Sequence, residues 1–208
     1  MLVAVTQRVE IEAKYRERRD CLDQRWNKLL QQFGIDAVPV PNTLHDVSAW
    51  IEAMHIGGVI LSGGNSLGVL GAAADSAPER DATEAELLSW ATLKKVPVLG
   101  VCRGMQMMNH YCGGTLAPID DHAGTAHEVI LAETEQQRRQ VNSFHNFCIP
   151  ADGLAPCFHV TAHDNEGNVE AMHHTELPWQ AIMWHPERDA SLHDDDRNLL
   201  VHLFEERD

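Results

Sequence analysis

The sequence predicts an α/β protein with a three-layer, mostly parallel, flavodoxin-like sheet, helices on both faces, and a smaller antiparallel β element in the second half. Over residues 1–111, short apolar runs rich in valine and isoleucine alternate with longer helix-like stretches. This alternation is typical of a parallel sheet covered by helices. After residue 112 the pattern changes to short strand-like runs between polar turns. With 208 residues, the chain is expected to form a single domain, 1–208.

Strands and helices are expected to alternate along the first half. The apolar runs that predict strands lie at 2–6, 35–40, 56–61 and 96–101. A helix is predicted over 15–33, with its apolar side chains on one stripe and Gly34 suited to end it. Further helices are predicted to about Met54, with Asn42 or Thr43 as N-cap, and over 78–95 and 105–111. Residues 67–77 give no assignment.

The second half predicts short strands and one final helix. The strand-like runs lie at 127–131, 140–149, 158–163, 168–172 and 179–184. The apolar run 181–184 is expected to return to the main sheet. Asp194 to Asp196 can cap the last helix, which is predicted from Arg197 to about Glu206.

Composition narrows the class of partner. The formal net charge of −15 argues against binding to nucleic acid or to anionic membranes. The apolar runs are too short to span a membrane, and the N-terminus shows no signal-peptide pattern. Five cysteines without paired spacing predict reduced thiols and a cytoplasmic location.

Cys102 lies where a predicted strand turns directly into a predicted helix. Gly100 and Gly104 flank it at two residues on each side. Such a turn strains the backbone at its apex and brings neighbouring side chains into collision, so glycine is favoured at both places. The thiol would lie at a helix N-terminus, where backbone N–H groups favour the thiolate. The sequence therefore favours a nucleophile over the alternative, a buried structural cysteine.

His185 stands out among 13 histidines because it directly follows an apolar strand. It would share the carboxyl edge of the sheet with Cys102. Glu187, two residues on, can orient the imidazole and complete a Cys–His–carboxylate array. The alternative is a surface histidine beside a surface glutamate.

Ser62-Gly-Gly-Asn65 follows another predicted strand. Paired glycines there can bring bare backbone N–H groups close to a developing oxyanion. An ordinary turn is the alternative.

Taken together, these motifs resemble class I glutamine amidotransferase domains, and within that superfamily the γ-glutamyl hydrolase branch, peptidase family C26. The resemblance rests on 100–106, 185–187 and 62–65 for the superfamily. It rests on Pro78-Glu-Arg-Asp81 with Glu84, Gly124-Thr-Ala-His-Glu128 and Val141-Asn-Ser-Phe-His145 for the branch. The resemblance covers most of the chain, about residues 56 to 190.

The resemblance implies roles for particular residues. Cys102 would attack a γ-carbonyl and form a γ-glutamyl thioester, with His185 as the base and Glu187 orienting it. The N–H groups of Gly64 and Arg103 would stabilise the oxyanion. The residues expected to hold the glutamyl group are Gly63, Asn65, Gln106, Asn142, Ser143, Phe144 and His145. The backbone around Ser143 and Phe144 would bind the α-amino and α-carboxylate ends of this group. His145 is expected to be structural or beside the substrate rather than catalytic.

The chain departs from typical members of this branch after the paired glycines, where it has Asn65-Ser-Leu-Gly-Val. This short loop, with Thr6-Gln7-Arg8, looks more like the subgroup of γ-glutamyl-CDP-amidate hydrolases. Arg8 or Arg80 is a candidate to meet an anionic leaving group.

Three functions are weighed: a free-standing γ-glutamyl hydrolase, a glutaminase subunit that supplies ammonia to a separate synthetase, and a non-catalytic binding module. The complete Cys–His–Glu set favours an enzyme. No cofactor and no metal are expected. The spacing of His122 and His127, and of His173 and His174, is not that of a zinc site. Gly63-Gly64 lacks the spacing of a dinucleotide loop. A homo-oligomer is left open.

Overall fold

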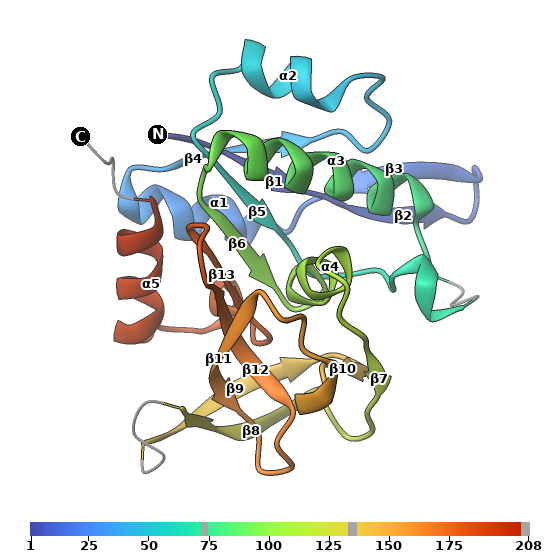
Figure 1. Ribbon diagram of the computed structural model, residues 1–208. Coiled ribbons are helices and arrows are strands. Elements are labelled where there is room, and N and C mark those ends of the chain that lie inside the picture. Colours follow the sequence, from blue (N-terminus) through green and yellow to red (C-terminus); the bar gives the residue numbers. More distant parts are fainter. Residues whose placement is uncertain (72–74, 133–136, 205–208) are drawn as a thin grey trace.

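A nine-stranded mixed sheet forms the centre of the protein (Figure 1). The computed structural model describes residues 1–71, 75–132 and 137–204. Five strands are parallel to their neighbours, in the order β4 (Asp36–Val40), β1 (Leu2–Thr6), β5 (Gly58–Leu61), β6 (Val98–Val101) and β13 (Trp179–Ile182). The antiparallel strands β12 (Val169–His174), β11 (Phe158–His163), β8 (Ala123–Leu131) and β9 (Arg138–Phe144) extend the sheet beyond β13.

Helices cover both faces of the parallel half. The helices α1 (Gln24–Leu30) and α5 (Asp194–Phe204) pack on one face. The helices α2 (Val47–Ala53), α3 (Pro78–Lys94) and α4 (Arg103–Tyr111) pack on the other. Side chains of β5 alternate between the two cores, with Ile60 facing α1 and α5, and Val59 and Leu61 facing the others. The predicted three-layer architecture is confirmed.

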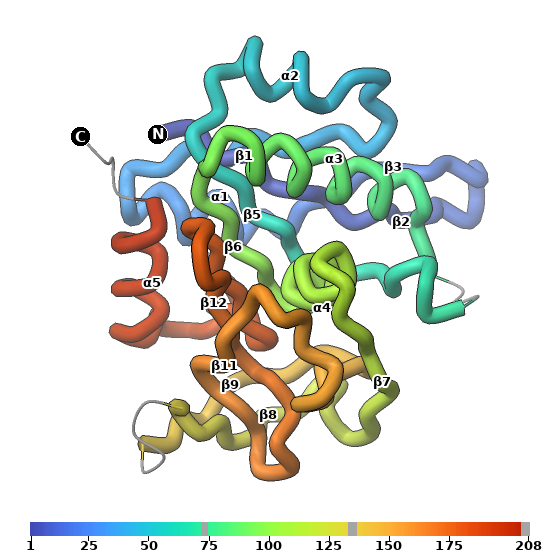
Figure 2. The backbone as a smooth tube through the Cα atoms, viewed as in Figure 1, coloured from blue at the N-terminus to red at the C-terminus, as the bar shows by residue number. Residues whose placement is uncertain are grey.

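The two halves of the chain meet at α4 (Figure 2). The parallel half (blue to green) leads through α4 into the antiparallel half (yellow to orange), where β7 (Ala117–Pro118) also pairs with β10 (Phe147–Cys148). The chain then returns to the sheet at β13, beside β6, as predicted from the apolar run 181–184. The carboxyl ends of β5, β6 and β13 therefore lie side by side.

The predicted helix over 15–33 is wrong in its first half. Residues 8–21 form a hairpin of β2 (Arg8–Glu12) and β3 (Glu17–Cys21), and the helix begins only after the N-cap Asp23. The hairpin is held by tertiary contacts, since Asp20 accepts hydrogen bonds from Asn42 and Arg18 pairs with Glu79. These contacts override the local helical pattern.

Smaller differences concern element boundaries. Asp46, not Asn42 or Thr43, caps α2, because its carboxylate accepts the backbone N–H of Ala49. The predicted strand 140–149 is two strands, β9 and β10. The final helix starts at Asp194, and its predicted last residues, 205 and 206, lie outside the described residues. Residues 68–70, for which the sequence pattern gives no assignment, form a short 3-10 turn.

Each of the five cysteines is a free thiol in the structure. Among the helices of the described residues, none combines the length and the apolar character that crossing a membrane requires.

Candidate active site

Cys102 lies at the joint between β6 and α4, as predicted. Its backbone has φ 53° and ψ −108°, a region that non-glycine residues rarely adopt. A Cβ on Gly100 would come within 2.5 Å of the sulfur of Met108, and a Cβ on Gly104 would collide with the backbone of Leu61. Both glycines are therefore required by the close approach of β5, β6 and α4 at this turn.

His185 and Glu187 follow β13 and come together in the buried interior of the site. Nδ1 of His185 lies 2.7 Å from Oε1 of Glu187, and the two residues are 1% and 7% exposed. Because Glu187 engages Nδ1, Nε2 is the nitrogen left to serve Cys102. Burial lowers the pKa of His185, but the charge and hydrogen bond of Cys102 and those of Glu187 outweigh it and raise the pKa to about 9. The surroundings therefore favour the imidazolium form of His185.

Gly63 lies directly against the imidazole ring of His185. A Cβ at this position would come within 2.5 Å of Cε1 of His185, so a side chain here would displace the ring. The predicted loop 62–65 therefore does contribute to the site.

Arg80 fixes the loop 62–65 through hydrogen bonds to its carbonyl groups. It donates hydrogen bonds to the oxygens of Ser62 at 2.6 Å, Gly63 at 3.1 Å and Gly64 at 2.6 Å. The C=O of Gly63 and the N–H of Gly64 belong to the same trans peptide group, so they point in opposite directions. Because the C=O of Gly63 points towards Arg80, the N–H of Gly64 points away from it, consistent with the predicted oxyanion role.

Four side chains form a charge-paired cluster, which we define as Arg80, Asp81, Glu84 and Arg103. All but the partly exposed Asp81 are buried. Glu84 bridges Arg80 and Arg103, and Arg103 also pairs with Asp81. Burial lowers the pKa of Arg80 to about 10, and Arg103 contributes to the shift. Burial would raise the pKa of Glu84, but Arg103 and Arg80 outweigh it and hold the pKa below its ordinary value.

This cluster corrects one sequence-based hypothesis. Arg80 is 0% exposed and its guanidinium is committed to Glu84 and the loop carbonyls, so it does not meet a leaving group. Arg8, the other candidate, borders the cavity above Cys102, with its side chain 47% exposed beside Glu10.

That cavity has a volume of about 290 Å³. It brings together several predicted residues, namely Gly64, Asn65, Cys102, Arg103, Gln106, Phe144, His145 and His185. Arg188, which sequence reasoning missed, also lines it and stacks 4.4 Å from the ring centre of Phe144. Its position next to Glu187 was the available signal.

Three residues that the sequence predicts to bind substrate have side chains engaged elsewhere. The amide of Asn142 accepts from the N–H of His185 at 2.9 Å and donates to its carbonyl at 2.8 Å, so it positions the histidine. The hydroxyl of Ser143 donates to the carbonyl of His122. The amide of Asn65 pairs with both main-chain groups of Val9. Their side chains are thus structural, while a backbone role for 143–144 stays a prediction.

Gln106 lies one turn into α4 and is 4% exposed. Its amide donates to the carbonyl of Phe147 at 2.9 Å. Arg103 is the first residue of α4, where backbone N–H groups have no partner within the helix. Its N–H stays the predicted second oxyanion donor.

The fold and this arrangement at the sheet edge define a class I glutamine amidotransferase-like protein. Two solved structures share the fold. A candidate GMP synthase subunit from Thermoplasma acidophilum has a TM-score of 0.70 and 20% identity, and the match covers 96% of this chain and 92% of that chain. A glutamine amidotransferase from Thermotoga maritima has a TM-score of 0.66 and 14% identity, and the match covers 97% and 81%.

Sequence comparison defines the family within this class. The peptidase C26 family profile matches residues 1–187, and the chain belongs to that family. The chain is 34% identical to the γ-glutamyl-CDP-amidate hydrolase of Campylobacter jejuni over 193 residues, 92% of each protein. It is 27% identical to a glutamine-hydrolysing GMP synthase subunit of Pyrococcus abyssi over 175 residues, 81% of this chain and 85% of that protein. The protein is a hydrolase of the glutamine amidotransferase-like type.

Proposed function

We propose that this chain is a free-standing, cysteine-dependent hydrolase that cleaves a γ-glutamyl amide bond and releases glutamate. The observation that carries the proposal is the buried Cys102–His185–Glu187 arrangement at the floor of a cavity. A thiol beside a histidine that a carboxylate orients is the arrangement of a nucleophile with its base.

In the proposed first step, the Cys102 thiolate attacks the γ-carbonyl carbon. The C–N bond then breaks, and His185 gives its proton to the leaving amine. Gly64 and Arg103 would donate their N–H groups to the oxyanion, each contributing about 3 kcal/mol of transition-state stabilisation. In the second step, water attacks the γ-glutamyl thioester. His185 takes a proton from that water, glutamate leaves, and the thiolate is restored.

The proposed substrate is a γ-glutamyl conjugate with an anionic leaving group, of the γ-glutamyl-CDP-amidate type. Support comes from the similarity to the Campylobacter jejuni hydrolase and from two arginines, Arg8 and Arg188, that line the cavity. These cations stand out in a chain of net charge −15. A negatively charged phosphoryl group on the leaving amine would pair with these guanidiniums.

Mass spectrometry of the intact protein mixed with γ-glutamyl amines, a γ-glutamyl phosphoramidate and glutamine tests the reaction. We expect a γ-glutamyl adduct on Cys102 and released glutamate. Cys102→Ala should lose both, with a rate loss of about 10⁴-fold or more. Cys112→Ala, at the other end of α4, is the matched control and should stay active. No adduct and no glutamate from any substrate would favour a non-catalytic binding module.

Arg8→Ala tests the leaving-group side. We expect KM for the phosphoramidate to rise about tenfold, from the loss of one charge-assisted hydrogen bond. KM for a neutral γ-glutamyl amine should hardly change. Equal effects on both substrates would contradict a role of Arg8 in recognising the anion.

The second candidate is a glutaminase subunit that supplies ammonia to a separate synthetase. It is favoured by the similarity to the GMP synthase subunit of Pyrococcus abyssi. This function predicts that glutamine is the preferred substrate and that turnover rises sharply when the synthetase is added. Efficient cleavage of conjugates with little cleavage of glutamine would favour the free-standing hydrolase instead.

A further inference from the structure

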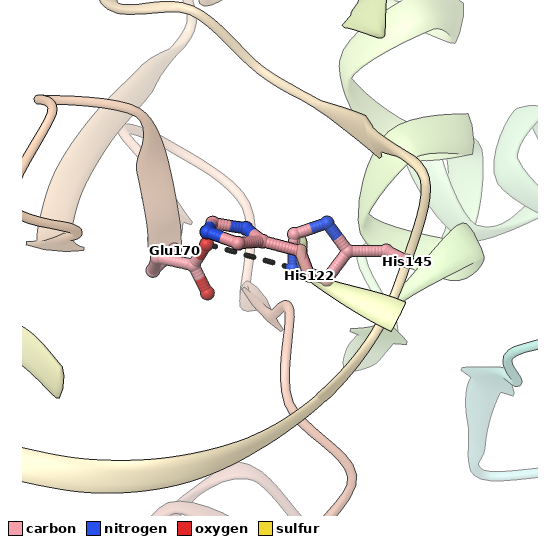
Figure 3. A group of neighbouring side chains, drawn as sticks. All are labelled: His122, His145 and Glu170. Atoms are coloured by element: carbon pink, nitrogen blue, oxygen red, sulfur yellow. Dashed lines mark ion pairs between the residues drawn. The ribbon is translucent and has the colours of Figure 1, made fainter. Parts of the chain in front are cut away.

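Next to the cavity lies a second group of titratable side chains, which we define as the histidine cluster: His122, His127, His145 and Glu170. His122 immediately precedes β8, His127 lies within β8, His145 follows β9 and Glu170 lies in β12. Figure 3 shows that the rings of His122 and His145 and the carboxylate of Glu170 gather at one point. Potential ligand atoms of these three residues all lie within 4.8 Å of one another.

Most polar atoms of this cluster are buried without a hydrogen bond. Within the described part of the chain, Nδ1 of His122, Nε2 of His145 and both carboxylate oxygens of Glu170 have no hydrogen-bond partner. His145 and Glu170 are only 3% and 1% exposed. Each such atom costs about 1–3 kcal/mol when it stays unpaired. Several of them facing one point indicate that the point binds a ligand.

The tautomer of His145 suits metal binding. Nδ1 lies 3.1 Å from the carbonyl oxygen of Phe147, so this nitrogen carries the proton and donates it. Nε2 is then a bare lone pair, 3.7 Å from Oε1 of Glu170. Metal-binding histidines are commonly fixed in this way, through a hydrogen bond from the other nitrogen.

His127 orients the other members. Its Nε2 lies 3.3 Å from Oε2 of Glu170, at ion-pair distance but without hydrogen-bond geometry. Its ring stacks on that of His122 with centres 4.5 Å apart. His127 thus contacts two of the three gathered residues and acts as an outer partner.

We propose that His122, His145 and Glu170 form a binding site for one divalent transition-metal ion, and that this ion is zinc. Two imidazoles and one carboxylate are a donor set that binds zinc in proteins. Tetrahedral zinc at its usual bond lengths places ligand atoms about 3.3 Å apart, and the His145–Glu170 pair is already at 3.7 Å. The ligand atoms of all three residues lie within 4.8 Å of one another, so side-chain movements of up to about 1.5 Å would bring them to this spacing.

The ion would tie together β8, β12 and the turn after β9. His145 also lines the cavity that contains Cys102, so the ion would fix one wall of the proposed active site. The donor set contains no sulfur, which separates this site from the nucleophile. This proposal replaces the sequence-based expectation that no metal binds.

Zinc titration of the metal-stripped full chain, with a chromogenic competitor and no substrate, tests the site. We expect one zinc per chain, bound equally well by Cys102→Ala. His122→Ala and Glu170→Gln should each weaken binding about 100-fold or more, and His127→Ala about 10–100-fold. Circular dichroism of each metal-free variant checks folding, and His122→Ala is the mildest change because this residue is partly exposed.

The matched control is the double variant His159→Ala with His173→Ala, which removes an exposed cross-strand histidine pair on β11 and β12. It should leave zinc affinity unchanged. Cobalt in place of zinc should give tetrahedral d–d bands without a thiolate-to-metal charge-transfer band. Unchanged affinity in His122→Ala and Glu170→Gln would overturn the proposal, as would loss of binding in Cys102→Ala or in the control. Because no turnover is measured, these results do not depend on the proposed hydrolysis.

Discussion

Two buried groups of charged and titratable side chains flank the Cys102 region, and they differ in how far their polar atoms are paired. In the charge-paired cluster, Glu84 contacts two guanidiniums and Arg80 contacts three loop carbonyls. In the histidine cluster, both carboxylate oxygens of Glu170 have no hydrogen bond within the described residues. Both glutamates are almost completely buried.

The difference teaches what each group can do. In the charge-paired cluster every charged side chain has an oppositely charged partner, although Nε of Arg103 has no hydrogen bond within the described residues. A buried network paired to this extent holds the backbone in one arrangement and has little capacity for a ligand. A group with bare lone pairs at a common point has that capacity but contributes less to stability by itself. The same residue type, glutamate, therefore has opposite pKa shifts: the two arginines lower that of Glu84, and burial raises that of Glu170.

The largest expected effect is that of Glu84→Gln. The change leaves two buried guanidiniums without their shared counter-charge, which should cost about 3–5 kcal/mol in the free energy of unfolding. Urea unfolding at neutral pH measures it. Glu86→Gln, an exposed site on the same helix, is the control and should change stability by about 0.5 kcal/mol or less. Similar values for both variants would mean that the network does not stabilise the fold.

A smaller effect is expected in the pH dependence of the free energy of unfolding, through the protonation of His145. Its folded pKa of about 4 lies below the ordinary value, so only the unfolded chain binds the proton between these values. The stability from this group is present above about pH 6.5 and is lost as pH falls towards 4, by up to about 3 kcal/mol. Urea unfolding of the metal-stripped protein from pH 7 to 4 measures the loss. His145→Gln should reduce this slope, and parallel curves for the two proteins would contradict the assignment.

The smallest effect is expected for Glu170→Gln in the metal-stripped protein. Because burial already disfavours its charge, removing that charge should shift the free energy of unfolding by no more than about 1 kcal/mol. The comparison with Glu84→Gln at the same pH sharpens the contrast between the clusters. A loss as large as that of Glu84→Gln would show that His127 and Glu170 form a strong ion pair.

The sequence predicted the parts of the site that lie within one turn of chain. One strand-to-helix joint contains Gly100, Cys102 and Gly104, and one short turn contains His185 and Glu187. Their spacing along the chain therefore predicts that they lie close together. The central sheet was predicted for the same reason, because each strand and helix has its own local pattern.

Relations across the sheet could not be predicted in this way. The histidine cluster brings together residues before β8, after β9 and within β12. Their spacing along the chain does not predict that these residues lie close together. The hairpin at 8–21 was mistaken for a helix because its contacts to Asn42 and Glu79 are distant in sequence. The structural hydrogen bonds of Asn65 and Asn142 were not predicted for the same reason, since their partners lie 56 and 43 residues away.

The hairpin β2–β3 has a practical consequence for engineering. Both main-chain groups of Val9 bond to Asn65, so the base of the hairpin abuts the loop beside the cavity. Its distal end projects beyond the sheet, with Tyr15 60% exposed. Grafting a hairpin of another length or charge onto the Val9–Asn65 junction would alter the cavity entrance while leaving the strands that carry Cys102 and His185 intact. Selectivity for the amine half of the proposed substrate could then be changed separately from the proposed reaction at Cys102.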